Sequence, residues 1–249
     1  MTTTATPPRA PVPPVRPSLS EQRERRSRSR RRILRLVLGL LLAAVVGTAV
    51  WLVYFSSVLA TTTVVVAGNR QLTPEQVTTV AAVPLGRPLA RQPLDDIARR
   101  TTALPQVSAA QVTREWPHTV RVTVTEREPL LAVVQPGGFL IADKAGVVFA
   151  AETTLPPGVA QVVADPANRS LLVELGSVVS ALPPEVRSQV AGIDAATPDS
   201  IRLRTTSNVT IVWGDSSQSA LKAQVATALL ASGASTTIDV SAPHAPATR

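Results

Sequence analysis

Hydrophobic and polar residues alternate strictly in the middle of the stretch REWPHTVRVTVTEREP, residues 114–129. A period of two is typical of a β-strand with one face on a core and the other toward water. The pattern therefore predicts a half-buried strand that ends in the polar segment Glu128-Pro129. The two alternating sets are Val120, Val122 and Val124 on one face and Arg121, Thr123 and Thr125 on the other.

A different pattern, an unbroken apolar run, lies nearer the start of the chain. Residues 36–55 contain no charged side chain, and a helix of that length covers about 30 Å, the hydrocarbon thickness of a bilayer. Trp51, Tyr54 and Phe55 lie at its far end, where aromatic rings favour the membrane interface. No other stretch approaches this length and hydrophobicity, so residues 33–55 are expected to form a single transmembrane helix.

The alternative to a membrane anchor is a cleaved signal peptide. Val58-Leu59-Ala60 resembles a cleavage site with small residues. However, the apolar run is longer than the 7–15 residues typical of a signal peptide, and more than 30 residues precede it. The pattern favours an uncleaved anchor and leaves cleavage after Ala60 open.

Capping signals predict two helices in the segment that follows the span. Thr73 and Gln76, with Pro74 between them, form a capping box that starts a helix running to about Val83. A second helix is expected after Gln92, because its first turn is acidic and its last turn is basic. Together with strands the order is β-α-α-β-β. The strands are expected over Thr61–Ala67, Val107–Arg114 and the alternating stretch described above.

The second half of the chain is predicted to be rich in strands. Gly-containing turns separate short apolar runs, and Asp215, with Gln218 three residues later, predicts the start of a helix. The apolar face of that helix would be Leu221, Val225, Ala228 and Leu229. Strands are expected over residues 130–134, 139–142, 147–150, 159–163, 201–204, 209–213 and 236–241, and a short helix over 184–190. The last strand, Thr236–Ser241, is a plausible sheet edge.

Composition removes several classes of function. The chain has no cysteine and only two histidines, His118 and His244. Disulfides, thiol catalysis and cysteine-ligated metals are therefore excluded, and a zinc site of the usual kinds is not expected. We expect no metal and no cofactor.

The net charge of +8 is confined to the start of the chain. Residues 1–35 hold ten arginines and two glutamates, and the remaining residues balance. The Pro- and Thr-rich beginning predicts a disordered tail over residues 1–32. Its arginine run is typical of a cytoplasmic topological signal that contacts anionic lipid. No aromatic residue is interleaved for base stacking, so nucleic acid is not an expected partner.

Three features invite a catalytic interpretation. Ser219-Ala-Leu-Lys222 matches S-x-x-K of penicillin-binding enzymes, but those enzymes also need K-T-G, and the only other lysine is Lys144 in DKAG. Lys222 is therefore interpreted as a solvated helix residue. His118 is interpreted as a turn histidine, because no G-x-S-x-G elbow exists. Glu126 and Glu128 are interpreted as a solvated strand end. No active site and no small-molecule substrate are predicted.

The ordered set of motifs resembles the FtsQ/DivIB family of bacterial cell-division proteins. VVVAGN, REWP and the alternating strand follow a single span, as in the POTRA domain of that family. FLIADKAGVVF is similar to the hairpin after that domain, and IVWGD and IDVSAP look like the actinobacterial branch. The resemblance implies an α+β protein with a POTRA domain over residues 61–129, a mixed, strand-rich β domain over 130–241 and a short tail over 242–249.

The resemblance also implies a function: a non-enzymatic, single-pass type II membrane scaffold at the division septum that regulates septal cell-wall synthesis. FtsB-like and FtsL-like single-pass proteins are the implied partners, the former by adding a strand to the last strand of the β domain. An ordinary edge closed by the protein's own tail or by the other sheet face is the alternative. A POTRA-bearing protein-transport factor and an extracytoplasmic cell-wall enzyme are the other functions left open. The implied partner-binding residues are Thr237, Ile238, Asp239, Val240 and Ser241.

Overall fold

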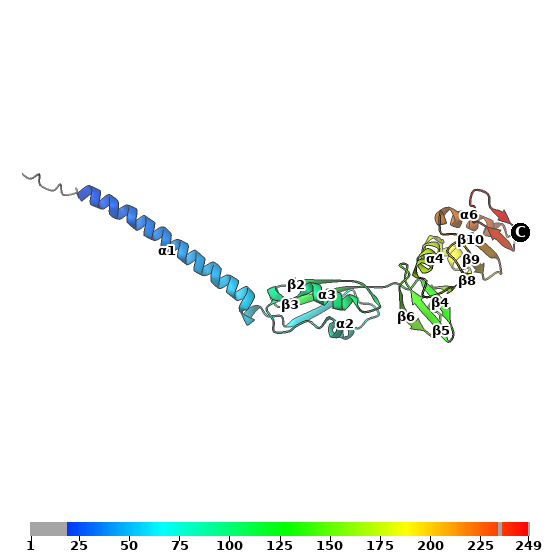
Figure 1. The fold of residues 1–249 in the computed structure, drawn as a ribbon, viewed down its shortest axis with the longest axis horizontal. Coiled ribbons are helices and arrows are strands. Elements are labelled where there is room, and N and C mark those ends of the chain that lie inside the picture. The colour runs from blue at the N-terminus through cyan, green and yellow to red at the C-terminus, as the bar shows by residue number, and fades with distance from the viewer. Residues whose placement is uncertain (1–18, 234–235, 249) are drawn as a thin grey trace, which may run out of the picture.

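A computed structural model of the protein describes residues 19–233 and 236–248. A long helix and two folded domains follow one another along the longest axis of the molecule (Figure 1). We call residues 56–129 the first domain and residues 130–248 the second domain. The α+β class expected from the sequence is confirmed.

The long helix α1 (Leu19–Phe55) contains the apolar run. Its segment Leu34–Phe55 has a mean hydropathy of 2.6, and by length and composition it is a candidate membrane span. The helix is 37 residues long because it begins well before this segment. Residues 19–32, which the sequence analysis assigns to a disordered tail, are therefore helical, and residues 1–18 of that tail lie outside the described residues.

The first domain is a three-stranded sheet with two helices, in the predicted order β-α-α-β-β. The sheet order is β1-β3-β2, with β1 parallel to β3 and β2 antiparallel to β3. Parallel pairing of β1 and β3 is possible because β2 runs antiparallel to β3 and returns the chain to the end of the sheet at which β1 starts. The elements are β1 (Thr63–Ala67), α2 (Pro74–Ala81), α3 (Leu94–Thr102), β2 (Val107–Glu115) and β3 (Thr119–Glu126).

The capping box predicted at Thr73 is present. The Thr73 amide donates to Gln76 Oε1 over 2.8 Å, and the Gln76 amide donates to Thr73 Oγ1 over 3.3 Å. At the other end of α2 the Arg100 guanidinium donates to the carbonyl oxygen of Ala81 over 2.7 Å. Both ends of the helix thus have partners for backbone groups that the helix itself leaves unpaired.

The alternation in β3 behaves as predicted. Val120, Val122 and Val124 are at most 2% exposed and pack with Val77 of α2 and Ile97 of α3. This burial fixes the register of the central strand, because a slip by one residue would place the polar set in the core.

The second domain contains a nine-stranded sheet in the order β12-β11-β10-β9-β8-β7-β4-β5-β6. Its main core combines residues of α4 and α6 with residues of the sheet. The strands are β4 (Leu131–Gln135), β5 (Gly138–Ala142), β6 (Val148–Glu152), β7 (Ala160–Val163), β8 (Val190–Asp194), β9 (Ile201–Thr205), β10 (Thr210–Gly214), β11 (Thr237–Asp239) and β12 (Ala247–Thr248). The helices are α4 (Arg169–Ala181), α5 (Pro184–Arg187) and α6 (Ser219–Ser232).

Three elements of this domain are absent from the sequence predictions: α4, β8 and β12. Helix α4 begins after Asn168, whose side chain accepts from the Leu171 amide over 3.1 Å. Strand β8 follows α5, so the helix expected over residues 184–190 ends at Arg187. The signal for α4 was present in the helical spacing of its buried residues. These are Leu171, Leu172, Leu175, Val178 and Val179.

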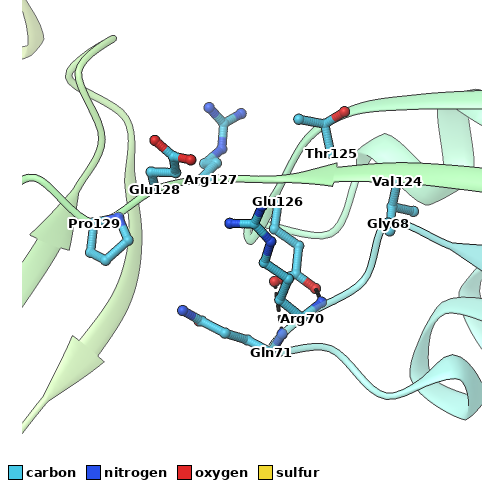
Figure 2. A pocket seen from close by; sticks show the side chains of 9 residues that line it. All are labelled: Gly68, Arg70, Gln71, Val124, Thr125, Glu126, Arg127, Glu128 and Pro129. Carbon is cyan, nitrogen blue, oxygen red and sulfur yellow. Dashed lines mark hydrogen bonds between the residues drawn. The ribbon is translucent and has the colours of Figure 1, made fainter.

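The carboxylate of Glu126 joins the end of β3 to the loop between β1 and α2. It accepts from the backbone amides of Arg70 and Gln71 (Figure 2) and from that of Leu72, each over 2.9 Å. The interpretation of Glu126 as a solvated strand end is therefore wrong, whereas Glu128 is exposed as expected. The carboxylate thus holds the loop through three backbone amides, although the loop contains no regular secondary structure.

The next residue, Arg127, connects the two domains. Its Nη1 lies 2.6 Å from Asp143 Oδ2, and the two side chains are only 17% and 9% exposed. Arg127 Nε also donates to the Pro105 carbonyl oxygen over 3.0 Å. Asp143 Oδ1 in turn accepts from the amides of Ala145 and Val147 in the turn between β5 and β6. The linker is thus tied to both domains by hydrogen bonds.

We predict that Glu126→Gln lowers the free energy of unfolding at pH 7 by about 1–3 kcal/mol, because a neutral amide accepts more weakly from three amides than a carboxylate does. Burial by itself would raise the pKa of Glu126, but the amides of Gln71, Arg70 and Leu72 outweigh it and hold the pKa below its usual value. The advantage of glutamate is therefore complete above the unfolded-state pKa of about 4.3 and is lost as the pH falls through the lower folded-state pKa.

Chemical unfolding of the detergent-solubilised chain between pH 7 and pH 3 measures this difference. The control is Glu128→Gln, which changes the same functional group at an exposed position. Equal loss of stability in the two variants at pH 7 would contradict the assigned role of Glu126.

Candidate functional site

Strand β11 contains most of the residues predicted to bind a partner. It lies parallel to β10, with Ile238 opposite Ile211 and Asp239 opposite Val212. The chain reaches it through α6, because a parallel neighbour requires a crossover connection. The site predicted at residues 237–241 therefore includes the second strand from one end of the nine-stranded sheet.

The side chains of this segment point alternately into the core and away from it. Ile238 and Val240 are at most 1% exposed and belong to the main core. Thr237 and Asp239 are half-buried and Ser241 is exposed. Of the five predicted residues, only these last three therefore present side chains that a partner could contact.

The outer side of β11 is covered by the chain itself. Strand β12 pairs with it antiparallel, with Thr248 opposite Ile238 and Ala247 opposite Asp239. The expectation that the last predicted strand forms the sheet edge is thus wrong for the described structure, in which the residues assigned to a tail supply one further strand. Both residues of β12 are exposed, so few apolar contacts support the pairing.

Along residues 237–241, successive backbone amides point alternately toward β10 and away from it. The Val240 amide donates to the Val212 carbonyl oxygen of β10 over 2.9 Å. Because directions alternate along a strand, the amides of Asp239 and Ser241 point to the outer side. The Ser241 amide is 2.9 Å from Asp239 Oδ1, which also accepts from Ser241 Oγ over 2.7 Å. This carboxylate fixes the chain where it leaves β11.

Beside this edge, Lys222 of α6 is buried with a carboxylate. The interpretation of Lys222 as a solvated residue is wrong, since it is 1% exposed. Its Nζ donates to Asp215 Oδ1 over 2.7 Å and to the Asp215 carbonyl oxygen over 2.9 Å. Asp215 does not cap the helix as predicted, because α6 begins at Ser219 and the residue before it, Gln218, makes no side-chain cap. The apolar face predicted for α6 is confirmed in part, since Val225 and Leu229 pack against the main core. The buried residues of the helix are Ser219, Lys222, Ala223 and Ala226.

The S-x-x-K pair has no catalytic geometry. Ser219 Oγ donates to the Ser216 carbonyl oxygen over 2.7 Å and accepts from Trp213 Nε1 over 3.3 Å. The lysine is held by Asp215 at the same time. These hydrogen bonds connect β10 to α6, so the pair acts as a structural contact beneath the sheet edge.

The remaining candidates also have structural partners. His118 lies in the turn before β3, and its Nδ1 is 3.2 Å from the Ala60 carbonyl oxygen. Within the part of the chain that the structure describes, no group of three or more His, Asp or Glu side chains could hold a metal ion.

Two family models match the chain. The FtsQ-type POTRA domain matches residues 59–127, and the C-terminal domain of cell division protein FtsQ/DivIB matches residues 132–241. Among solved structures, the chain is similar to the major extracytoplasmic domain of the trans isomer of DivIB from Geobacillus stearothermophilus, with 18% identity, a TM-score of 0.36, and coverage of 43% of this chain and 93% of that one.

Curated relatives cover most of the chain. Cell division protein FtsQ of Streptomyces bingchenggensis is 41% identical over 234 residues, which are 90% of this chain and 88% of that protein. Cell division protein FtsQ of Streptomyces venezuelae is 37% identical, with 87% of this chain and 83% of that protein covered. The protein of the same name from Mycolicibacterium smegmatis is 34% identical, with coverage of 86% and 64%.

We predict that Asp215→Ala lowers the free energy of unfolding by about 2 kcal/mol, because it leaves the buried Lys222 ammonium with a carbonyl oxygen as its remaining identified acceptor. This is less than the loss for a fully buried pair, since the Asp215 side chain is 49% exposed. Lys222→Met removes the charge and keeps the length of the side chain, so its cost is smaller. Chemical unfolding of the purified variants measures both, and an Asp215→Ala protein no less stable than Lys222→Met would contradict the argument.

The hydrogen bond from Lys222 holds the pKa of Asp215 below its usual value. The contribution of this pair to stability is therefore complete above the unfolded-state pKa of about 3.9 and is lost as the pH falls through the folded-state value. The difference in unfolding free energy between the parent and Asp215→Ala should accordingly shrink below about pH 4. A difference that grows as the pH falls would contradict it.

Proposed function

This chain belongs to the FtsQ/DivIB family of cell division proteins, and on that premise we propose that it is a non-enzymatic membrane scaffold of the divisome. Its role is to bring other division proteins together and thereby to regulate septal cell-wall synthesis. The POTRA domain takes part in recruitment, and the β domain binds the partners. The hydrogen bonds of Ser219 and Lys222 within the domain support a binding role over catalysis.

In this proposal the protein is a single-pass type II membrane protein at the division septum. The arginine-rich segment precedes the apolar part of α1, so the positive-inside rule assigns the N-terminus to the cytoplasm. Both folded domains then lie outside the cytoplasm. This orientation gives them access to the extracytoplasmic parts of other single-pass division proteins.

Partner binding occurs by strand addition to β11. The observation that carries this proposal is that β11 is held firmly on one side and weakly on the other. Its inner side pairs with β10, and its buried residues Ile238 and Val240 anchor it in the core. Among the described residues, its outer side pairs with the two-residue strand β12, whose residues are both exposed. A longer strand from an FtsB-like partner would replace more hydrogen bonds than leave with β12.

The side chains of Thr237, Asp239 and Ser241 give this interface its selectivity. All three lie on the alternating positions that point away from the core. Ile238 and Val240 contribute by holding the strand in place. An FtsL-like protein binds alongside the FtsB-like strand, so the complex forms at one edge of the β domain.

We predict that Asp239→Pro weakens binding of an FtsB-like extracytoplasmic segment at least tenfold. Proline removes an outward-pointing amide that a partner strand needs, while the amides directed at β10 remain. Asp239→Ala is the matched control, because it also loses the carboxylate that accepts from Ser241 but keeps the amide. Titration of the detergent-solubilised full chain with the labelled partner segment measures the dissociation constants. Equal affinities of the proline and alanine variants would contradict strand addition at this edge.

Removal of residues 246–249 tests the competition with β12. If the partner takes the place of β12, the shortened chain should bind several-fold more tightly, because no internal pairing has to be broken first. The control is Ala247→Ser, which keeps the backbone groups of β12. Weaker binding by the shortened chain would show instead that the partner adds to β12 or contacts it directly.

A further inference from the structure

The first domain exposes three large hydrophobic side chains that the proposed function does not use. Within residues 56–129, all of which the structure describes, these are Val58, Leu85 and Trp116, with exposed fractions of 62%, 63% and 52%. They come from three separate segments: the connection after α1, the loop after α2 and the turn between β2 and β3. The other large apolar residues of this domain are buried or half-buried.

Sheet topology brings these three segments to one end of the domain. The amide of Thr62 donates to the His118 carbonyl oxygen over 2.9 Å, which joins the start of β1 to the turn that contains Trp116. The amide of Thr61 donates to the Arg87 carbonyl oxygen, and the Gly86 amide donates to the Thr61 carbonyl oxygen, each over 2.9 Å. The loop that contains Leu85 is therefore fixed against the same point of the chain.

This end of the domain is also where the candidate membrane span arrives. Helix α1 ends at Phe55, and the Arg91 guanidinium lies 5.4 Å from the centre of the Phe55 ring. Figure 1 shows α1 meeting the first domain at the end opposite the linker to the second domain. Val58 is three residues beyond the span, which a chain can extend over at most about 10 Å. Such a distance is comparable to the interfacial layer of a bilayer, about 5–8 Å on each side.

The entry of the chain into the domain is held by buried polar contacts. Gln92 is 3% exposed, and its Nε2 donates to Thr61 Oγ1 over 2.9 Å and to the Pro84 carbonyl oxygen over 2.7 Å. Arg114 donates through Nε to the Leu89 carbonyl oxygen over 2.9 Å. These contacts hold the start of β1, the loop after α2 and the end of β2 together at this end of the domain.

Two positively charged side chains at this end of the domain could pair with the phosphate groups of lipids. Arg87 is exposed on the loop that also contains Leu85, and Arg91 is exposed at the end of the short 3-10 helix that follows, Leu89–Arg91. Glu115, in the neighbouring strand β2, is paired with Arg121. Asp95 and Asp96 lie farther along, in the first turn of α3, where Asp96 is paired with Arg99. Arg87 is two residues from the exposed Leu85, and Arg91 lies over the Phe55 ring at the end of α1.

We propose that this end of the first domain is a lipid-binding surface that rests on the outer face of the membrane spanned by α1. Val58, Leu85 and Trp116 insert into the interfacial layer, where aromatic and aliphatic side chains of peripheral segments are stable. Arg87 and Arg91 contact the phosphates of the lipid headgroups. The domain is thereby oriented relative to the membrane and not merely tethered to it. This inference rests on the proposed membrane span.

The absence of cysteine from the chain permits a direct test with single labelling sites. Cysteine is introduced singly at Leu85, at Trp116 and, as a matched exposed apolar position in the second domain, at Leu155. A fourth variant, Val45→Cys, reports on the span. Each is labelled with a small fluorophore, and the full chain is reconstituted into vesicles of phosphatidylcholine and phosphatidylglycerol. Quenching is measured with nitroxide lipids and, separately, with iodide in the water.

Labels at positions 85 and 116 should be quenched by nitroxide lipids several-fold more than the label at 155, and should be several-fold less accessible to iodide. The proposal is overturned if these labels behave like the label at 155 while the label at 45 is quenched by lipid. Such a result would indicate that the exposed apolar residues bind a protein partner and not lipid. If the label at 45 is not quenched by lipid either, the span itself is wrong, and the proposed membrane topology is wrong with it.

A charge variant tests the role of the arginines. Arg87→Glu should reduce the lipid quenching of the label at position 116 at least twofold in vesicles with phosphatidylglycerol, because it replaces attraction to phosphate by repulsion. Arg70→Glu, an exposed charge reversal at the opposite end of β1, is the control and should leave the quenching unchanged. Equal effects of the two variants would overturn the assignment of headgroup contacts to this end.

Discussion

The parallel pairing of β1 with β3 is the constraint on which the rest of this structure depends. It brings the chain from the membrane helix directly beside the central strand of the first domain. The start of β3 lies next to the entry of β1, through the hydrogen bond between Thr62 and His118. The end of β3 contains Glu126, which orders the loop after β1, and leads into Arg127, which contacts the second domain. One strand thus links the end of the candidate span to the second domain, to which we assign partner binding.

Sequence patterns predict the first domain well because its determinants are local. The capping box at Thr73 and the alternation of Val120, Val122 and Val124 each specify an element within a few residues. The role of Glu126 could not be predicted in this way. Its three donors lie more than fifty residues earlier in the chain, and a glutamate between polar residues has the same sequence pattern whether it is solvated or bound. Only the fold brings the loop to the carboxylate.

The second domain shows where local patterns fail. Lys222 follows polar and small residues, as a solvated lysine would, and its burial depends on the position of Asp215 at the end of β10. Of the five residues implied as the partner site, three lie in β11 and two follow it, and β12 covers the outer side of that strand. A two-residue strand after a proline-containing turn has too little pattern to be recognised. By contrast, the spacing of Leu171, Leu175 and Val178 in α4 did contain a helical signal.

These contacts together support one central claim: the protein holds its partner-binding edge at a defined position relative to the membrane. The claim depends on the linker, where Arg127 is bonded to Asp143 and to Pro105. The most direct test is the distance between spin labels on Thr79→Cys in the first domain and Gln224→Cys in the second, measured on the reconstituted full chain. The account predicts a narrow distribution that broadens when Arg127 is replaced by alanine. A distribution that is already broad with Arg127 present would contradict it.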